Sequence, residues 1–237
     1  MTDVSKSPER IAGMFDAIAG RYDLLNHVLS AGIDKRWRTR AIRSLRLTGR
    51  ERVLDLCTGT GDLAIAATRA QPSAALVIGV DFSGAMLRVG HGKLRRARLD
   101  DRVTMVQGDA TRIPLADGSV DAVTIGFGIR NVERMDDACA ELHRVLKPGG
   151  RLAILEFAEP TTPVFGGFYR WYVRRVLPRI GRAVSRSDVA YEYLPASIAA
   201  FATPDEFVKI LRQARFTAIS PVRLMLGSVI LYTATRG

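Results

Sequence analysis

The chain has 237 residues, of which 47% are hydrophobic and 25% are charged, so it can bury a full core and is not a disordered protein. No apolar run approaches the roughly 18 residues of a membrane-spanning helix, and the N-terminus lacks the apolar segment of a secretory signal. The two cysteines, Cys57 and Cys139, show no metal-ligand spacing and give no reason to expect a disulfide. These features favour a metal-free protein of the reducing cytoplasm.

Positive charge dominates the composition. Lysine and arginine number 35 against 24 aspartates and glutamates, which leaves a net charge of +11. Such a charge attracts polyanions, which in a cell are nucleic acids or the anionic surface of a membrane. An arginine-rich composition without any such partner is the alternative.

Residues 1–50 are predicted to be helical. Ser7 followed by Pro8 is a typical helix start. A second, basic helix is predicted from Asp34 to Leu47 and ends before Gly49. Apolar residues recur at helical spacing in the first helix, at Ile11, Met14, Phe15 and Ile18.

From residue 51 the pattern changes to short apolar runs that alternate with helical segments. This alternation predicts a parallel sheet with right-handed crossovers and helices on both faces. A last helix is followed by two strand-like runs, whose short link predicts an antiparallel hairpin that closes the sheet. The expected strands are Arg52–Cys57, Ala75–Val80, Val103–Gln107, Val120–Ile125, Arg151–Glu156, Phe216–Val222 and Ser228–Thr235. One expected helix follows the first strand and ends near Pro72. The others are expected over Ser83–Ala97, Met135–Leu146 and Pro204–Ala214, and a turn is expected at Lys147–Gly150.

A glycine-rich turn follows the first predicted strand, in the run V-L-D-L-C-T-G-T-G-D-L-A from Val53 to Ala64. Its G-x-G-x-x-A pattern also occurs in dinucleotide-binding enzymes and is weak evidence alone. The acids near it are more informative, because a pyrophosphate would be repelled by them and a ligand with an ammonium group and a sulfonium would be held. The pattern therefore predicts S-adenosylmethionine (SAM) rather than NAD. The acids are Asp55, Asp62, Asp81 and Asp109, of which Asp62 and Asp109 could instead be helix or turn caps.

In this interpretation Asp55 attracts the ammonium group of SAM, directly or through water, and Asp81 accepts from both ribose hydroxyls. Asp109 accepts from the adenine amine, and the backbone of the glycine turn lies along the methionine part. The residues predicted to bind the cofactor are Asp55, Gly59, Thr60, Gly61, Asp81, Phe82, Asp109 and Ala110.

Motifs along nearly the whole chain resemble the class I SAM-dependent methyltransferases, and more narrowly the C-methyltransferase family of menaquinone and ubiquinone biosynthesis. The matching runs are F-D-A-I-A-G-R-Y-D-L-L-N-H-V-L-S up to Ser30, D-K-R-W up to Trp37, I-G-F-G-I-R-N-V from Ile125, R-V-L-K-P-G-G-R-L-A-I-L-E-F from Arg144 and Y-E-Y-L-P-A-S-I-A-A-F from Tyr191. The chain departs from the family at Leu25 (usually Met), Asp34 (usually His), Gly126 and Ala158 (both usually Ser). Its closing L-M-L-G-S-V-I-L-Y departs from the usual T-G-G-x-x-x-L-Y.

The resemblance implies an α/β fold: a doubly wound, mostly parallel, seven-stranded Rossmann-like sheet with N-terminal helices and a helical insert after strand five. It implies one domain over residues 1–237. The parts are a helical cap (1–50), a cofactor-binding core (51–157), a substrate lid (158–203) and a final helix with a hairpin (204–237).

The implied reaction moves the methyl group of SAM to a ring carbon of a polyprenyl quinol. Demethylmenaquinol is the preferred substrate, and a polyprenyl methoxy-benzoquinol of ubiquinone biosynthesis is the alternative. Such a reaction needs a deprotonated or polarised ring hydroxyl and no metal. We expect Arg130 to stabilise the phenolate and Tyr22 or Asp23 to take part in proton removal. Asn26, Asn131 and Tyr193 are expected to bind the substrate.

Each of these residues also has a structural interpretation. Asp23 could pair with Arg21 or cap a helix, Asn131 could be a turn residue, and His27 is more typical of a helix surface than of a base.

A polyprenyl substrate lives in the bilayer, so we expect a cytoplasmic protein that associates peripherally with the anionic inner face of the cytoplasmic membrane. The basic helix around Trp37 and an arginine- and aromatic-rich run over Phe165–Arg182 are the candidate docking surfaces. The aromatic residues could equally be core. The sequence allows a homo-oligomer but does not define one.

Two other functions stay open. A nucleic-acid methyltransferase would explain the charge, but the chain has F-G-I-R-N where an N/D-P-P-Y/F loop is expected, and neither cysteine follows a proline. We therefore expect no nucleic-acid partner. A non-catalytic nucleoside-binding protein is disfavoured by the predicted cap and insert, which are typical of a substrate lid.

Overall fold

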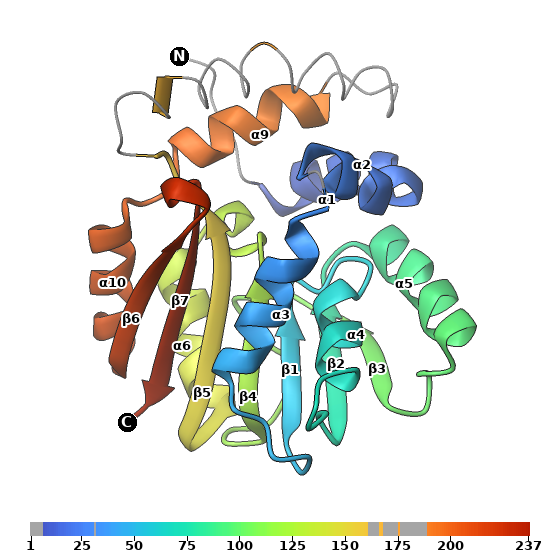
Figure 1. Ribbon diagram of the computed structural model, residues 1–237, viewed down its shortest axis with the longest axis vertical. Helices are drawn as coiled ribbons and strands as arrows, with labels where there is room; N and C mark the ends of the chain where they lie inside the picture. Colours follow the sequence, from blue (N-terminus) through green and yellow to red (C-terminus); the bar gives the residue numbers. More distant parts are fainter. Residues whose placement is uncertain (1–6, 31, 161–165, 168–174, 176–188) are drawn as a thin grey trace.

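The computed structural model describes residues 7–30, 32–160, 166–167, 175 and 189–237. A seven-stranded sheet in the order β3-β2-β1-β4-β5-β7-β6 forms its centre (Figure 1). The strands β1 to β5 pair in parallel, whereas β7 is antiparallel to both β5 and β6. The predicted doubly wound sheet with a closing hairpin is thus confirmed. The strands are β1 (Arg52–Leu56), β2 (Leu76–Asp81), β3 (Val103–Gln107), β4 (Val120–Gly126), β5 (Leu146–Phe157), β6 (Phe216–Leu224) and β7 (Val229–Arg236).

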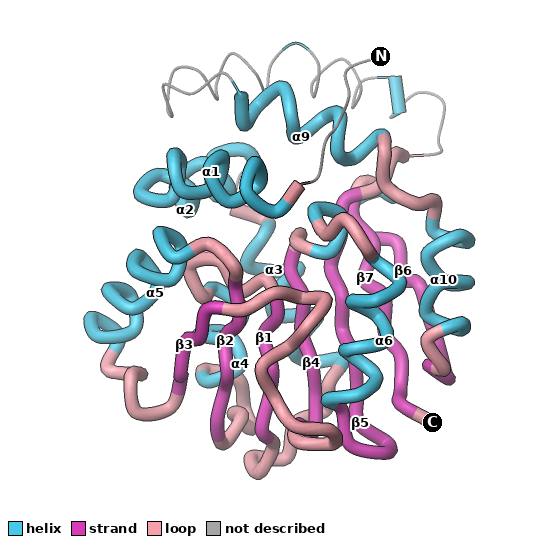
Figure 2. Tube along the Cα trace, turned by 180° about the vertical axis from the view of Figure 1, so that it is seen from behind, coloured by secondary structure: helices cyan, strands magenta, loops and turns pink. Residues whose placement is uncertain are grey.

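Helices cover both faces of the sheet. The helices α3 (Asp34–Ser44), α4 (Asp62–Thr68) and α5 (Gly84–Ala97) lie on one face, and α6 (Met135–Val145) and α10 (Pro204–Gln213) lie on the other (Figures 1 and 2). This double cover explains the nearly continuous apolar character of the strands, since side chains of both orientations are buried.

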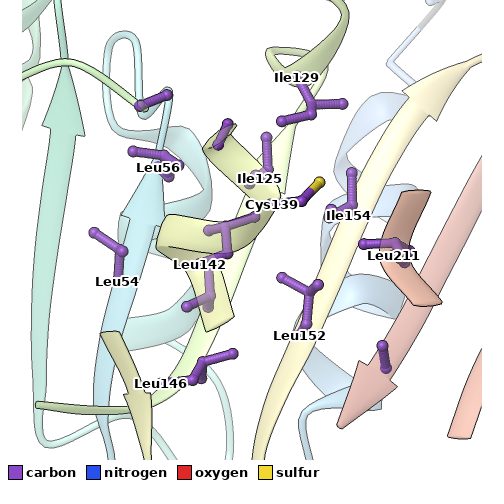
Figure 3. Packing of buried hydrophobic residues seen from close by; sticks show 14 of the residues in the cluster. Leu54, Leu56, Ile125, Ile129, Cys139, Leu142, Leu146, Leu152, Ile154 and Leu211 are labelled. Atoms are coloured by element: carbon purple, nitrogen blue, oxygen red, sulfur yellow. The ribbon is translucent and has the colours of Figure 1, made fainter. Parts of the chain in front are cut away.

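The hydrophobic core is split by the sheet into two layers. Leu54 and Leu56 of β1 point to the α6 side, where they meet Leu142 of that helix (Figure 3). Val53 of the same strand belongs to the other layer and packs with residues of α3, α4 and α5, such as Ile42. The alternation along β1 fixes the register of the central strand and therefore the position of the glycine turn that follows it.

A helical cap lies over the carboxyl ends of the parallel strands (Figures 1 and 2). It consists of α1 (Pro8–Ile18), the 3-10 turn η1 (Ala19–Arg21), α2 (Tyr22–Leu29) and α9 (Val189–Ala199). Helix α1 touches both α5 and α9. Ligands of open α/β sheets bind at this edge, so the cap covers the expected site.

Several predicted boundaries were wrong. Strand β5 begins at Leu146, the last residue of the expected helix, and includes the whole expected turn Lys147–Gly150. Leu146 pairs with Val120 before the register shifts, and Gly149 takes a positive φ. Helix α3 ends at Ser44 rather than Leu47, since Arg46 has a left-handed backbone. Ser7 precedes α1 as expected, but its side chain makes no capping hydrogen bond.

The expected docking run Phe165–Arg182 lies almost wholly outside the described residues. Within the part of the chain that is described, no helix combines the length and the apolar character needed to cross a membrane.

Candidate functional site

A cavity of about 310 Å³ lies between the carboxyl ends of the parallel strands and the helical cap. Helix α1 contributes Ile11 and Phe15 to its wall, and Tyr22 begins α2 beside them. The cavity is mostly apolar with a few polar groups, as is usual for sites that bind small molecules. The other lining residues are Leu56, Cys57, Gly59, Val80, Asp81, Phe82, Met86, Gly108, Asp109, Ala110, Thr111, Gly126, Phe127, Gly128, Asn131, Val132, Glu133 and Arg134.

The glycine turn needs glycine at two positions for different reasons. Gly61 has φ +84° and precedes helix α4, and a Cβ there would lie 2.4 Å from Cε of Met105. Gly59 has φ +56° and faces the cavity, where its ideal Cβ would sit 3.9 Å from the Tyr22 ring. The turn therefore presents bare backbone to a ligand.

Asp55, in β1, fixes the glycine turn through hydrogen bonds to residues on both sides of it. Its carboxylate accepts hydrogen bonds from Oγ1 of Thr58 (2.6 Å), Oγ1 of Thr124 (2.7 Å) and the backbone N–H of Ala64 (3.1 Å). The side chain is only 1% exposed and does not line the cavity. Burial raises its pKa to about 6, although the three hydrogen bonds lower it. The acid that we expected to meet the ammonium group is thus engaged with protein groups.

Asp81, at the end of β2, both bonds to the glycine turn and lines the cavity. Its Oδ2 accepts from the N–H of Gly59 (2.8 Å) and its Oδ1 from the N–H of Ser83 (2.9 Å). Burial raises its pKa against these hydrogen bonds, and the nearby carboxylate of Asp16 raises it further. Asp81 lines the cavity, so the free lone pairs of its two oxygens can accept from a ligand.

Asp109, Ala110 and Phe82 form the adjoining part of the wall. Oδ1 of Asp109 accepts from the N–H of Thr111 (2.8 Å), while Oδ2 has no hydrogen-bond partner among the residues that the structure describes. One carboxylate oxygen is therefore left to accept from an amine in the cavity.

Asp62 has a different role from the one that the sequence suggested. Its oxygens pair with Nη1 of Arg38 (2.9 Å) and Nζ of Lys93 (2.5 Å), and it does not line the cavity. Burial would raise its pKa, but the two cations outweigh burial and lower it. We expected four acids around the ligand, and only two of them, Asp81 and Asp109, line the cavity. Asp55 and Asp62 lie outside its lining, where protein groups bind their carboxylates.

Asp23 belongs to the same group of charges. Its Oδ2 lies 2.6 Å from Nζ of Lys93, and its Oδ1 accepts from Oγ1 of Thr60 at 2.5 Å. Neither Asp23 nor Thr60 lines the cavity. We call Asp23, Arg38, Asp62 and Lys93 the ionic cluster; it ties α2 to α3, α4 and α5. Its two cations were missed by sequence reasoning, because nothing local distinguishes them from the many other basic residues.

The far side of the cavity joins the core to α9. Asn131 lines the cavity, and its Oδ1 accepts from the hydroxyl of Tyr193 (3.0 Å). Tyr22 is half-buried across from it; burial raises its pKa, and a hydrogen bond with the side chain of Asn26 lowers it in part. Burial also raises the pKa of Tyr193. Both tyrosines are therefore protonated at neutral pH and can donate hydrogen bonds.

Arg130 is buried beside this group. Its Nη1 pairs with Oε1 of Glu156 (2.9 Å) and also donates to the carbonyl of Phe127, and its Nε donates to Oγ of Ser197 on α9 (3.3 Å). The guanidinium does not line the cavity. Its positive charge nevertheless lowers the pKa of both Tyr22 and Tyr193, against the larger effect of burial.

Glu156 was not among the expected site residues, although it is 0% exposed. It accepts from Arg130 and from the N–H of Phe157 (2.8 Å), at the carboxyl end of β5. An acid that ends an otherwise apolar strand was the available signal.

Two departures from the family pattern have a local explanation. A Cβ on Gly126 would lie 2.7 Å from Cδ1 of Leu63, so a serine there would require Leu63 to shift. Asp34 is buried and pairs with Arg38 (2.5 Å), Ser30 (2.9 Å) and His27 (3.3 Å). His27 thus lies in this polar group and does not line the cavity.

Comparison with solved structures places the fold among SAM-dependent methyltransferases. A SAM-dependent methyltransferase of Thermotoga maritima, described as a possible histamine N-methyltransferase, matches with a TM-score of 0.65 and 18% identity over 95% of this chain and 99% of that one. A putative S-adenosyl-L-methionine-dependent methyltransferase of Methanococcus maripaludis matches with a TM-score of 0.65 and 20% identity over 92% and 91%. At these identities the likeness concerns the fold.

Curated relatives are closer in sequence. The ubiquinone/menaquinone biosynthesis C-methyltransferase UbiE of Syntrophotalea carbinolica is 48% identical over 94% of this chain and 92% of its own length. The protein of the same name from Geobacter sp. (strain M21) is 44% identical over the full length of both. The demethylmenaquinone methyltransferase of Bacteroides fragilis is 39% identical over 98% and 94%. Since the family model also matches residues 1–236, the chain belongs to the ubiE/COQ5 methyltransferase family.

Proposed function

We propose that this chain transfers the methyl group of SAM to a ring carbon of a polyprenyl quinol, with demethylmenaquinol as the substrate. The observation that carries the proposal is the pair of cavity-lining acids, Asp81 at the end of β2 and Asp109 after β3, next to the bare glycine turn that follows β1. The relatives named for menaquinone and ubiquinone biosynthesis support the class of substrate.

The residues around the cavity fit SAM. Asp81 would accept from the two ribose hydroxyls, and the free Oδ2 of Asp109 would accept from the adenine amine. Phe82 and Ala110 would contact the adenine, and Gly59 would leave room for the methionine part. Gly61, which was also expected to bind the cofactor, does not line the cavity and would only shape the turn. When bound, SAM supplies an electrophilic methyl group. Asp55 would favour its ammonium group only through the turn that it holds, because its own carboxylate is occupied.

The substrate ring would lie between Tyr22 and Asn131, which face the cavity from the cap and from the loop after β4. The ring carbon would bond to the methyl group as the bond between that methyl and sulfur breaks, and S-adenosylhomocysteine would leave. The ring hydroxyl would give its proton to water, and the ring carbon would lose its own proton to water when the ring becomes aromatic again.

The positive charge of Arg130 lowers the pKa of Tyr22 and of Tyr193, although burial keeps both protonated. The same charge would lower the pKa of a hydroxyl on the substrate ring and so favour its phenolate form. Tyr22 would donate a hydrogen bond to the developing oxyanion, and Asn26 would orient Tyr22. Tyr193 already donates its hydroxyl proton to Oδ1 of Asn131, so it would hold Asn131 in place beside the ring.

Asp23 is the weaker candidate for proton removal. Its two oxygens are bound to Thr60 and Lys93, so it would first have to exchange one of these partners for a water. We assign it mainly to the position of α2.

A second substrate, the polyprenyl methoxy-benzoquinol of ubiquinone biosynthesis, stays open because several relatives carry both pathway names. Both quinols are lipids, so we propose a cytoplasmic enzyme that associates peripherally with the anionic inner face of the membrane and does not bind nucleic acid. A homo-oligomer is compatible with this proposal.

Quinone extraction from a strain that lacks the gene tests the function. We expect demethylmenaquinone to accumulate and menaquinone to return when the gene is restored. Accumulation of a demethyl benzoquinone would assign the second substrate. An unchanged quinone pool in a strain whose quinones are methylated would refute the proposal.

A further inference from the structure

The exposed large hydrophobic residues of the described chain gather at one end of the molecule. They are Leu24 (56% exposed), Met225 (45%) and Leu226 (66%). Leu24 lies on α2 in the cap, and the other two form the turn between β6 and β7, which Figure 1 shows at the same end as α2 and α9. This is the end that holds the cavity. The β6–β7 turn and α2 lie on opposite sides of this end (Figure 1), so the three residues form two separate exposed apolar points. The larger point, Met225 with Leu226, is the one that calls for a partner.

The β6–β7 turn is built to point its side chains outward. Met225 and Leu226 have φ +45° and +55°, in the left-handed region that favours glycine. Their neighbours on each side, Leu224 and Val229, are buried. The carbonyl of Met225 accepts from the N–H (3.1 Å) and the hydroxyl (2.9 Å) of Ser228, which fixes the turn.

Leucine at the tip is costly twice over, since it strains the backbone and exposes an apolar side chain. Counted back from Leu231-Tyr232, Leu226 stands where the T-G-G-x-x-x-L-Y pattern has glycine. A residue that stabilises neither the turn nor the core calls for a role outside the folded monomer.

Basic residues frame this end of the molecule. Arg10 is on α1, Lys35 and Arg36 begin α3, and Arg223 precedes the turn; all four are exposed. Exposed apolar side chains flanked by lysine and arginine are the combination that suits the interface of an anionic bilayer. A protein partner would not require the bases, whereas phosphate headgroups would.

We propose that Met225 and Leu226 insert into the headgroup and upper acyl region of an anionic membrane, with Leu24 as a second contact point across the cap. This inference rests on the proposed function, because a lipid substrate requires the cavity end to face the bilayer. With the β6–β7 turn inserted, the cavity would lie close to the membrane, so that the ring of a quinol could enter it while the prenyl tail stays in the bilayer.

Co-sedimentation of the full chain with vesicles of mixed phosphatidylglycerol and phosphatidylcholine tests the proposal. The variant Leu226→Gly removes the side chain and suits the left-handed backbone, so folding is preserved. We expect the affinity for vesicles to fall about tenfold, because the variant no longer buries a leucine side chain in the membrane. Binding should also weaken at high salt or on phosphatidylcholine alone.

The variant Ala218→Gly is the matched control. Ala218 also has a positive φ (+48°) and is exposed, but it lies near the other end of β6, where Thr217 pairs with Thr235. Its substitution relieves the same strain and should leave vesicle binding unchanged. Equal binding by the parent and Leu226→Gly, or no binding by the parent, would overturn the proposal.

Three further measurements separate this surface from the enzyme activity and from self-association. Leu226→Gly should keep the parent affinity for SAM and the parent rate on a short-chain, water-soluble quinol, and lose rate on a long-chain quinol in vesicles. If no quinol is methylated but vesicle binding still depends on Leu226, the proposed function fails and the membrane surface stands. If sedimentation velocity shows that Leu226→Gly dissociates a dimer while vesicle binding is unchanged, a second copy is the occupant and the proposal fails.

Discussion

The two halves of the cavity are held in different ways. The cofactor half is fixed by hydrogen bonds from backbone and hydroxyl groups to Asp55 and Asp81, which end or adjoin buried strands. The substrate half is closed by helices that reach the core through the ionic cluster, and through the contacts of Arg130 and Asn131 with α9. The first arrangement consists of buried acids bonded to backbone and hydroxyl groups. The second includes partly exposed charged side chains that can exchange partners with water.

This difference suggests that the cofactor half is preorganised and that the cap can open to admit a substrate. Variants on the two sides should therefore separate binding of SAM from binding of the quinol.

Asp81→Ala should have the largest effect. It would remove the two proposed charge-assisted hydrogen bonds to the ribose, worth about 1.5–3 kcal/mol each, so the Kd for SAM should rise about 100-fold or more. Isothermal titration with SAM measures it. Asp117→Ala, which changes an exposed acid far from the cavity, is the control and should bind like the parent. Unchanged SAM affinity in Asp81→Ala would remove this acid from the cofactor site.

Arg130→Ala should affect both turnover and stability. It leaves Glu156 buried without its cation, which costs about 3 kcal/mol or more. It also removes the charge that favours a phenolate, so methyl transfer should fall about 100-fold.

Arg130→Lys separates these two effects, since it keeps the charge with a poorer fit to Glu156 and Ser197. We expect kcat to recover in part, with little change in the affinity for SAM. Urea denaturation and steady-state kinetics measure both quantities. Full turnover in a folded Arg130→Ala variant would show that the guanidinium has no part in the chemistry.

The raised pKa of Asp55 leads us to expect that the stability of the fold depends on pH. Its pKa is raised from 3.8 in the unfolded chain to about 6 in the fold, so folding favours the protonated acid. This contribution is fully present below about pH 4, is lost as pH rises through 6, and amounts to about 3 kcal/mol at most.

Asp55→Asn cannot ionise, so the free energy of unfolding of the parent should fall relative to this variant between pH 4 and 7. Urea denaturation at each pH gives the difference. A gap between parent and variant that stays constant with pH would mean that Asp55 does not titrate in this range.

Lys93→Met tests the ionic cluster and should have the smallest effect. The pairs with Asp23 and Asp62 are partly exposed, so we expect a loss of about 1 kcal/mol in stability. The KM for quinol should rise several-fold and the Kd for SAM should rise less. The cluster touches the glycine turn at Thr60, but Asp55 and Asp81 also hold that turn. Lys147→Met, which breaks a surface pair with Asp121, is the control. A larger change in SAM affinity than in quinol KM would reverse the assignment of the cluster.

The sequence predicted the cofactor half better than the substrate half, for a physical reason. The glycine turn and the acids at strand ends follow from local pattern, because each strand delivers its last residue to the same edge of the sheet. Asp81, Phe82, Asp109 and Ala110 therefore line the cavity as expected.

The local pattern could not predict which acids have carboxylates that are already bonded to other groups of the protein. Asp55 is followed by Thr58, whose hydroxyl turns back to it, and Asp62 meets cations from α3 and α5 that are distant in sequence. Whether an acid faces a ligand or a protein partner is decided by tertiary packing. The same limit applies to Arg130, whose partner Glu156 lies 26 residues further along the chain.

Transfer of a labelled methyl group from SAM to reduced demethylmenaquinol tests the central claim most directly. We expect the label on the quinol with the parent protein and, at a SAM concentration near the Kd of the parent, about 100-fold less label with Asp81→Ala. A folded parent protein that leaves the quinol unlabelled would contradict the account.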